Sequence, residues 1–348
     1  MNYIHRTGWL AFFAVTLVFP WLLPNPAVTT IAVATLLYAA VAAGWNIFSG
    51  YTGYISLGHG AFFGIGAYSL AIMCQDWNVK GDYFPFLLLP LAGLLAALCA
   101  LPFGWIALRT RRQTFVVITI AFFFITQLMA YNLRSLTNGS TGLTLPIPSW
   151  SGDFFNVPFY YVSLAVLLLA LAVSWWIRHS KYGLGLLAIR DDEGRALGLG
   201  VSAEASKLVA FAVSAWFAGV GGGIYAYFVG AIYPPFAFDP TINVGLTLMA
   251  LIGGLGTLAG PILGAVMVSP VQQYLVLQYG ENGWYQMIYG VLFLVVLLAL
   301  PEGIIPTLQK KWSSFVGSFH KKQKRDTALP VTGTLVHEEN VLAKPKQQ

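Results

Sequence analysis

The sequence predicts an all-α protein that crosses a membrane many times. Of its 348 residues, 57% are hydrophobic and only 9% are charged, and the mean hydropathy is +0.70. Soluble globular domains carry about 25% charged residues, so this composition excludes an ordinary soluble domain. Backbone polar groups find no water in lipid, and the long apolar runs are therefore expected to be helices.

Ten apolar runs are candidate spans, because a helix needs about 20 residues to cross a bilayer and a broken one needs fewer. In chain order they are expected at approximately Gly8 to Leu23, Ala27 to Phe48, Thr52 to Cys74, Pro85 to Leu108, Thr114 to Leu133, Pro158 to Ile177, Leu208 to Tyr233, Ile242 to Gly256, Thr257 to Gln278 and Trp284 to Leu300. The first run has the charge and length of a signal peptide. No small-x-small cleavage site follows it cleanly, so we expect an uncleaved span.

The Lys and Arg residues orient these spans. With a cytoplasmic N-terminus, ten crossings place 17 of the 19 basic residues inside and only Lys80 and Arg134 outside, as the positive-inside rule requires. A re-entrant run at Ile242 to Gly256 would move the basic tail outside, so full crossings are preferred. We expect residues 1–308 to form a transmembrane domain and residues 309–348 to form a flexible basic cytoplasmic tail. The HKKQKR run of this tail is suited to contact anionic membrane lipid.

Residues 178–207, here called the charged segment, carry nine charged residues, whereas the apolar runs on either side carry almost none. Residues 183–190 and 191–197 have the pattern of two short amphipathic helices, with glycines that break or turn the chain. Ser202 is suited to cap the next span, with Glu204 in its first turn. Short rigid helices of mixed charge suit insertion into a groove on another protein. An ordinary solvated loop is the equally supported alternative.

Known chemical motifs are absent from the sequence. It contains no P-loop, HExxH or GxSxG motif, and its five histidines are scattered. The predicted spans hold no Asp, Glu, Lys or Arg, so the chain is not expected to couple to protons by itself. Cys74 and Cys99 lie in or beside apolar runs and are expected to pack there. We therefore predict a chain that is not an enzyme, holds no metal or cofactor, binds no nucleic acid and draws any energy from a cytoplasmic partner.

Two glycine-rich stretches, Gly50 to Tyr68 and Gly253 to Ala265, have two interpretations. Small residues let helices pack closely, and Gly with Pro also breaks helices beside polar cavities. Under the second interpretation they border a translocation path, for which the candidates are Asn46, Gly53, Ser56, Gly58, His59, Gln127, Gly253, Gly254 and Thr257. His59 is expected to be hydrogen-bonded at a helix break rather than to relay protons.

Three stretches carry a family resemblance. They read WNIFSGYTGYISLGHGAFFGIGAY, SKYGLGLLAIRDDEGRALGLGVSAEASKLVAFAVSAWFAGVGGGIYA and LMALIGGLGTLAGPILGA. Together with the layout of Thr114 to Pro148, they resemble the LivM-type permeases of branched-chain amino acid ATP-binding cassette (ABC) importers, from Tyr38 to Pro306. The resemblance implies a ribose/branched-chain amino acid permease-like architecture in the bacterial inner membrane. It also implies a second, LivH-like permease subunit, two ATPase subunits that hold ATP and Mg, and a periplasmic binding protein.

The resemblance also assigns residues. It places the ATPase contact at Ala188, Ile189, Arg190, Asp191, Asp192, Glu193, Arg195, Ala196, Leu197 and Gly198. In the outer loop, Arg134, Asn138, Ser140 and Thr141 either gate the path or dock the binding protein, or they belong to a turn rich in Asn, Gly and Pro. The span from Thr114 to Leu133 lacks the acidic residue expected near its middle, and Gln127 is the nearest polar substitute.

That departure leaves the substrate open. Branched-chain amino acids are the leading expectation, because an uncharged path suits small zwitterions or neutral amphipathic solutes. Urea, amides or aromatic acids are alternatives within the same architecture, and a ribose-type sugar permease is a further one. From other classes, a secondary carrier, a facilitative channel or a membrane scaffold remains open.

Overall fold

The structure is a computed structural model that describes residues 16–23, 25–150, 152–279, 284–299 and 303. Contacts divide the chain into Met1–Pro306 and Thr307–Gln348. The predicted basic tail and the first half of the first predicted span lie outside the described residues. Everything below concerns the first unit.

Helices make up most of the described chain, which confirms the predicted all-α class. After a helical stretch at residues 16–22, the elements are α2 (Pro26–Thr52), α3 (His59–Asp76), α4 (Phe84–Ala107), α5 (Arg112–Asn132), α6 (Arg134–Thr137), η1 (Gly139–Thr141), β1 (Leu143–Thr144), η2 (Gly152–Phe154), α7 (Asn156–His179), α8 (Lys181–Asp191), α9 (Glu193–Gly198), α10 (Ala203–Val229), β2 (Ala231–Ile232), α11 (Pro234–Ala237), α12 (Pro240–Gly253), α13 (Gly260–Tyr279) and α14 (Trp284–Ala299).

Six of the helical segments in the described residues are long and apolar enough to cross a membrane. They are α2, α4, α5, α7, α10 and the segment Pro234–Gly253, which joins α11 to α12. Each coincides with one of the predicted spans. The predicted spans at α3, α13 and α14 are helical as well, but they do not belong to this group of six, so the count of ten stays a prediction.

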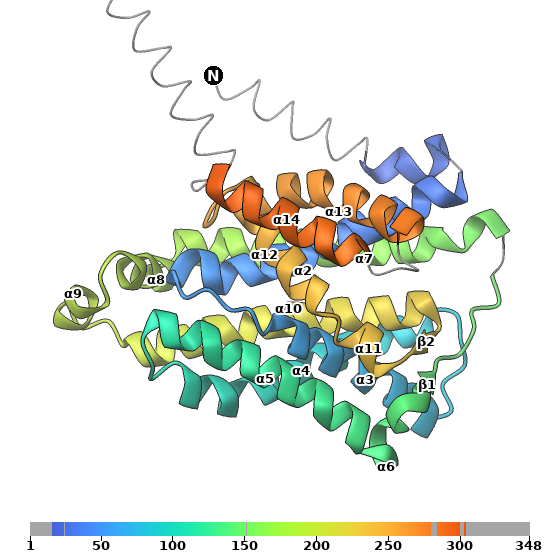
Figure 1. The fold of residues 1–348 in the computed structure, drawn as a ribbon, viewed down its shortest axis with the longest axis horizontal. Helices are drawn as coiled ribbons and strands as arrows, with labels where there is room; N and C mark the ends of the chain where they lie inside the picture. Colours follow the sequence, from blue (N-terminus) through green and yellow to red (C-terminus); the bar gives the residue numbers. More distant parts are fainter. Residues whose placement is uncertain (1–15, 24, 151, 280–283, 300–302, 304–348) are drawn as a thin grey trace, which may run out of the picture. The chain divides into compact units, whose positions relative to one another are not determined.

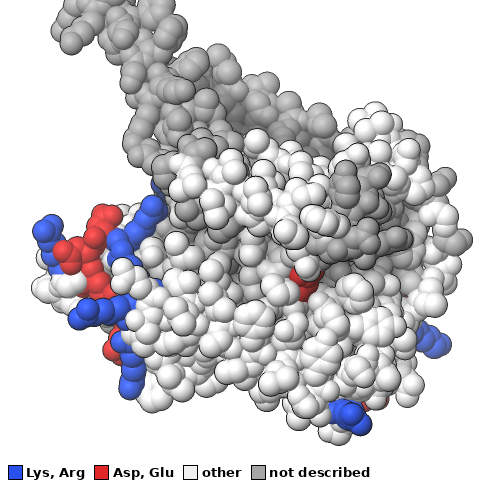
Figure 2. Space-filling view, in the orientation of Figure 1, with Lys and Arg blue, Asp and Glu red and all other residues white. Residues whose placement is uncertain are grey.

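The connections between helices gather at two ends (Figure 1). We call the end that holds α8 and α9 the charged end and the end that holds α6, β1 and β2 the sheet end. The charged end holds eight of the ten described Lys and Arg residues, and the sheet end holds only Lys80 and Arg134. Figure 2 shows the same concentration of charge on one side of the molecule. The eight described basic residues that the sequence assigned to one side of the membrane therefore share one end.

Glycines bring the central helices close together. A Cβ atom at Gly66 of α3 would lie 2.1 Å from the carbonyl oxygen of Gly219 on α10, and one at Gly222 would lie 1.9 Å from that of Phe63. In the same way, a Cβ atom at Gly253 would lie 1.7 Å from the carbonyl oxygen of Gly260, and one at Gly264 would lie 1.7 Å from that of Met249. Without a strong hydrophobic force between helices in lipid, close backbone approach is what holds such helices together. The packing interpretation of both glycine-rich stretches is confirmed.

Two membrane helices include charged residues that lie outside the predicted span bounds, although Glu204 was expected in the first turn of the helix that Ser202 precedes. α10 begins at Ala203 rather than at Leu208 and so includes Glu204 and Lys207. The span Pro234–Gly253 includes Asp239 between its two helices. Lys207 is paired with Glu193 and Asp239 caps α12, and hydropathy alone does not indicate either contact.

Replacing Gly66 with Leu is expected to lower the stability of the folded protein by about 1–3 kcal/mol, because α3 and α10 must separate to admit the side chain. The measurement is thermal unfolding of the purified protein in detergent. Gly290→Leu is the matched control, since a Cβ at Gly290 meets no atom within 4 Å. Equal unfolding temperatures for the two variants would contradict the packing argument.

Candidate functional site

The charged segment folds as two short helices, as predicted. Ser180 caps α8 by accepting a hydrogen bond from the Gly183 amide at 3.1 Å. Asp192 ends α8 in an extended conformation and caps α9 by accepting one from the Arg195 amide at 3.0 Å. Ser202 stands at the N-cap of α10, but its side chain makes no capping hydrogen bond. Asp192 is thus both the corner between α8 and α9 and the residue that starts α9.

Three arginines tie this segment to the membrane helices. Arg112 of α5 donates to the carbonyls of Ile189 and Arg190, at 2.7 and 2.8 Å, where α8 ends. Arg190 donates to the carbonyl of Gly50 near the end of α2, at 2.8 Å. Arg178 of α7 donates to the carbonyl of Gly256 after α12. The last carbonyls of a helix lack partners and carry partial negative charge, so Arg112 and Arg190 stabilise the ends of α8 and α2, while Arg178 holds the turn after α12.

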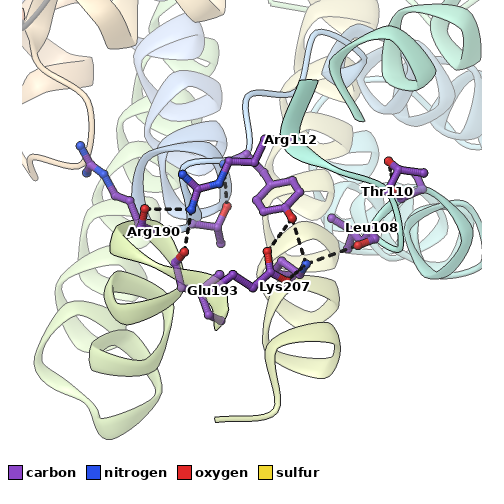
Figure 3. A network of polar contacts seen from close by, with 10 residues as sticks. Leu108, Thr110, Arg112, Arg190, Glu193 and Lys207 are labelled. Atoms are coloured by element: carbon purple, nitrogen blue, oxygen red, sulfur yellow. Dashed lines mark hydrogen bonds and ion pairs between the residues drawn. The ribbon is translucent and has the colours of Figure 1, made fainter. Parts of the chain in front are cut away.

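A buried ion pair joins α9 to α10 (Figure 3). The Lys207 ammonium lies 2.5 Å from Glu193 Oε1, and the two side chains are 2% and 29% exposed. The Tyr54 hydroxyl donates to Glu193 Oε2 at 2.6 Å, and Lys207 also donates to the carbonyl of Leu108 at 3.3 Å. Burial raises the pKa of Glu193, but the hydrogen bonds from Lys207 and Tyr54 and the charge of Lys207 outweigh it and lower the pKa overall. Glu193 therefore stays ionised.

The predicted ATPase-contact residues divide into two groups. Asp191, Asp192, Arg195, Leu197 and Gly198 are exposed. Ile189 and Ala196 are buried within the chain, and Ala188, Arg190 and Glu193 are partly buried. The second group holds the segment in place, and the first group is presented outward.

Two exposed leucines extend the outward surface. Leu184 of α8 is 63% exposed and Leu199, after α9, is 82% exposed. Sequence reasoning passed over both. The sequence did contain a signal for them. In a segment rich in charge, a leucine that does not fit the apolar face of a helix is a candidate contact for a partner protein.

A cleft of about 720 Å³ lies beside α9, between the end of α4 and the start of α10. Its lining includes Trp105, Arg109, Glu193, Leu197 and Lys207. The Arg109 guanidinium stacks on Trp105 at 4.1 Å. The buried ion pair therefore lies at the inner wall of this cleft.

The predicted path residues fall into three places. Asn46 accepts a hydrogen bond from the Gly256 amide at 2.8 Å and donates to the carbonyl of Thr257 at 3.0 Å, so it holds the turn between α12 and α13 against α2. Gly254 and Thr257 belong to that turn, which Gly253 precedes as the last residue of α12. Gly53 adopts a left-handed conformation, with φ of 72°, at the end of α2.

His59 lies in the second place, at the break before α3. Its Nδ1 is 2.9 Å from the Ser56 hydroxyl and its Nε2 is 2.7 Å from the Ser214 hydroxyl. It is buried among Phe48, Phe62 and Phe211. The predicted hydrogen-bonded histidine at a helix break is confirmed. Gly58, beside it, packs against the backbone of Thr119.

Gln127 stands apart from the other path candidates. Its amide donates to the carbonyl of Phe238 at 2.9 Å and so joins α5 to the break between α11 and α12. The structure therefore brings Asn46 together with Gly254 and Thr257, and Ser56 with His59. Gln127 belongs to a third location.

The outer loop crosses the sheet end. Its candidates Arg134, Asn138, Ser140 and Thr141 are all exposed, and Asn138 adopts a left-handed φ of 58° in the turn. β1 pairs antiparallel with β2, and the Ser149 hydroxyl and amide donate to Asp82 at 2.6 and 2.7 Å. These hydrogen bonds from Ser149 lower the pKa of Asp82. The loop is thus fastened to the α3–α4 connection and to the end of α10.

Comparison with known proteins gives consistent matches. The family model for the permease component of branched-chain amino acid transport systems matches residues 27–297. The branched-chain amino acid permease LivM of Salmonella typhimurium is 27% identical over 85% of this chain and 74% of its own length. LivH of the same organism is 26% identical over 78% of this chain and 93% of its own length. The autoinducer 2 permease LsrC of Yersinia pseudotuberculosis is 30% identical over only 38% of this chain and 39% of its own length. No solved structure matches the chain.

Lys207→Met is expected to lower the stability of the folded protein by about 3–5 kcal/mol, because it leaves the Glu193 carboxylate partly buried without its cation. Adding Glu193→Leu should recover most of that loss, since an apolar pair needs no desolvation. Thermal unfolding in detergent measures both. The control is Arg195→Met, which breaks an ion pair with Asp192 whose side chains are 86% and 47% exposed. If Arg195→Met lowered the unfolding temperature as much as Lys207→Met, the stronger effect expected for the buried ion pair would be contradicted.

The stabilisation by Glu193 is expected to depend on pH. Because its pKa is lowered in the folded protein, the stabilisation is present above the unfolded pKa of about 4.3 and is lost as the pH falls through the folded value. Unfolding of wild type and Glu193→Gln, measured from pH 7 to pH 3, should show a difference that is largest at pH 7 and shrinks in acid. If the difference in stability grew as the pH fell, the pKa of Glu193 would be raised in the folded protein rather than lowered.

Proposed function

This chain belongs to the family of permease components of branched-chain amino acid transport systems, and we propose that it is the membrane subunit of an ABC importer that carries branched-chain amino acids inward. It is a permease rather than an enzyme, and in such importers separate subunits hydrolyse ATP. The single observation that carries the proposal is the charged segment. It presents α8 and α9 outward while arginines and a buried ion pair fasten it to α2, α5, α7 and α10.

This arrangement suits the transfer of force from a partner. A push on α9 acts through Glu193 and Lys207 on α10, and a push on α8 acts through Arg190 on α2. Arg178 connects α7 to the turn after α12. ATP-driven closure of two ATPase subunits, which hold the ATP and Mg, would in this way move several membrane helices together.

The partners follow from the relatives. The chain is similar to both LivM and LivH permeases, which supports a complex of two related permease subunits. A periplasmic binding protein would deliver the substrate to the sheet end. The exposed outer-loop residues Arg134, Asn138, Ser140 and Thr141 are the proposed docking or gating positions.

The helix ends support ten spans with a cytoplasmic N-terminus in the inner membrane. α2, α4, α7 and α12 end at the charged end, and α3, α5, α10 and α13 begin there, as the contacts of Arg112, Arg178, Arg190 and Lys207 indicate. Gly303, shortly after α14, lies against Gly254. The excess of basic residues makes the charged end the cytoplasmic one.

The test reverses charge on the outward surface. Asp191→Lys combined with Arg195→Glu is expected to abolish ATP-dependent leucine uptake into vesicles that contain the whole importer and binding protein, because the ATPase groove would meet the wrong charges. Asp192 is left unchanged, since it caps α9. Binding of the ATPase subunits is measured by co-purification.

The control is Arg134→Glu, a charge reversal at the sheet end, which should keep ATPase co-purification. Normal uptake by the double variant would overturn the coupling role. Uptake of leucine by wild type without ATP would favour a carrier or channel. ATP-dependent uptake of urea or an aromatic acid in place of leucine would move the chain to one of the alternative substrates.

A further inference from the structure

The cleft beside α9 begins where an exposed apolar face of α4 ends. Four apolar residues of α4 follow one another at spacings of three or four positions and so share one face of the helix. They are Leu94, Leu98, Leu101 and Trp105, which are 47%, 51%, 38% and 55% exposed. Because α4 is long and apolar enough to cross a membrane, this face is turned toward lipid. Trp105 also lines the cleft, so the lipid-facing surface of α4 leads into it.

The mouth of the cleft lies at the depth of lipid headgroups. Tryptophan is enriched at the boundary between hydrocarbon and water. The Arg109 guanidinium, one helical turn beyond Trp105, stacks on the Trp105 ring at 4.1 Å. Long basic side chains near the ends of membrane helices extend toward the headgroups in this way. The two residues therefore mark where the membrane surface crosses the charged end.

Three charged side chains of the cleft stay unpaired. Arg109 and Arg111 line it from the connection between α4 and α5, and Glu204 lines it from the first turn of α10. All three are exposed, and none makes an ion pair or a side-chain hydrogen bond within the part of the chain that the structure describes. Lys207 and Glu193 neutralise each other at the inner wall, where Figure 3 shows them. The cleft thus offers two cationic groups and one anionic group to a ligand.

This pattern of charge is complementary to a headgroup that carries both a phosphate and an ammonium. Guanidinium groups bind phosphate oxygens through paired N–H donors, and a carboxylate accepts hydrogen bonds from an ammonium. A purely anionic headgroup would meet the Glu204 carboxylate, and a quaternary ammonium has no N–H to donate to it. Ser202, whose hydroxyl does not cap α10, adds a further donor to the lining.

The shape and the apolar lining of the cleft favour a lipid over a soluble zwitterion. Its volume of about 720 Å³ is in the range of small-molecule sites and is ample for a headgroup. Trp105, Leu108, Leu197 and Leu208 supply apolar surface beside the charges. A soluble zwitterion such as an amino acid would use the charges but would leave the adjoining apolar face of α4 without a role.

We propose that the cleft binds a membrane phospholipid with a phosphoethanolamine headgroup, whose phosphate lies on Arg109 and Arg111 and whose ammonium lies on Glu204. Its acyl chains then follow the apolar face of α4. The bound lipid joins the α4–α5 connection to α9 and α10 at the outer side, as Lys207 does at the inner wall through its hydrogen bond to the Leu108 carbonyl. The charged segment is in this way braced against the membrane, whichever solute the chain carries.

The test measures which lipid the protein retains. The full-length chain, purified in detergent with the subunits that accompany it, is given equal amounts of phosphatidylethanolamine, phosphatidylglycerol and phosphatidylcholine with identical acyl chains. Native mass spectrometry then counts the bound lipids. Wild type should retain phosphatidylethanolamine in preference to the other two.

Two sets of variants separate the phosphate contact from the ammonium contact. Arg109→Gln combined with Arg111→Gln should lower retention of phosphatidylethanolamine by about tenfold or more, as expected for lost hydrogen bonds to a charged group. Glu204→Gln should instead shift the preference toward phosphatidylglycerol, because an anionic headgroup no longer meets a carboxylate. The unfolding temperatures without added lipid should stay close to wild type, since these side chains make no ion pair in the protein.

Arg195→Gln is the matched control. It removes a guanidinium at the same end whose side chain is 86% exposed and which does not line the cleft, so it should retain phosphatidylethanolamine as wild type does. Equal retention of the three lipids by wild type would overturn the inference. Unchanged retention by the double arginine variant would overturn it as well.

Two other occupants of the cleft are distinguished in the same experiment. Displacement of the lipid by water-soluble phosphoethanolamine at equal concentration would replace the lipid with a soluble ligand. Loss of the ATPase subunits from the double arginine variant, with lipid retention unchanged, would make the arginines an ATPase contact instead. A wild-type complex that retains the lipid but imports no leucine would overturn the proposed function and leave this inference intact.

Discussion

The structure of the charged end depends on the ion pair that the buried Lys207 ammonium forms with Glu193. An unpaired ammonium is costly away from water, so its position requires Glu193, and Glu193 in turn requires Tyr54 and the first turn of α9. One cation thus determines where α9, α10 and the turn after α2 meet. The arginines extend the same arrangement, since each places its charge on backbone carbonyls that would otherwise lack partners.

Below this end, the chain depends on close packing instead of charge. Gly66, Gly219 and Gly222 allow α3 and α10 to approach until their backbones touch, and His59 satisfies both ring nitrogens with serine hydroxyls. A rigid interior of this kind transmits displacement between the two ends, because it has no loose volume in which movement is absorbed.

Much of the candidate site was predictable from particular residues. Alternating apolar and charged positions around Asp191 predicted two short helices, and the Ser-Leu-Gly-His sequence predicted a hydrogen-bonded histidine at a break. The pairing of Glu193 with Lys207 was not predictable, because the sequence offers several cations at similar spacing and only packing decides which one is buried. Asp239 was missed for a related reason. A proline and a polar residue beside it lower local hydropathy, so the position looked like a connection between spans.

The sequence by itself determined the class of the protein, the main membrane helices and the side on which its charge gathers, because these follow from composition and from the cost of charge in lipid. Only the tertiary structure decided which residues of the charged segment face outward, which guanidinium holds which helix end, and that Gln127 donates to the Phe238 carbonyl at the break between α11 and α12. Those features depend on contacts between residues far apart in the chain, from 77 positions for Arg112 and Ile189 to 140 positions for Arg190 and Gly50. Local sequence patterns do not specify which of these distant residues come into contact.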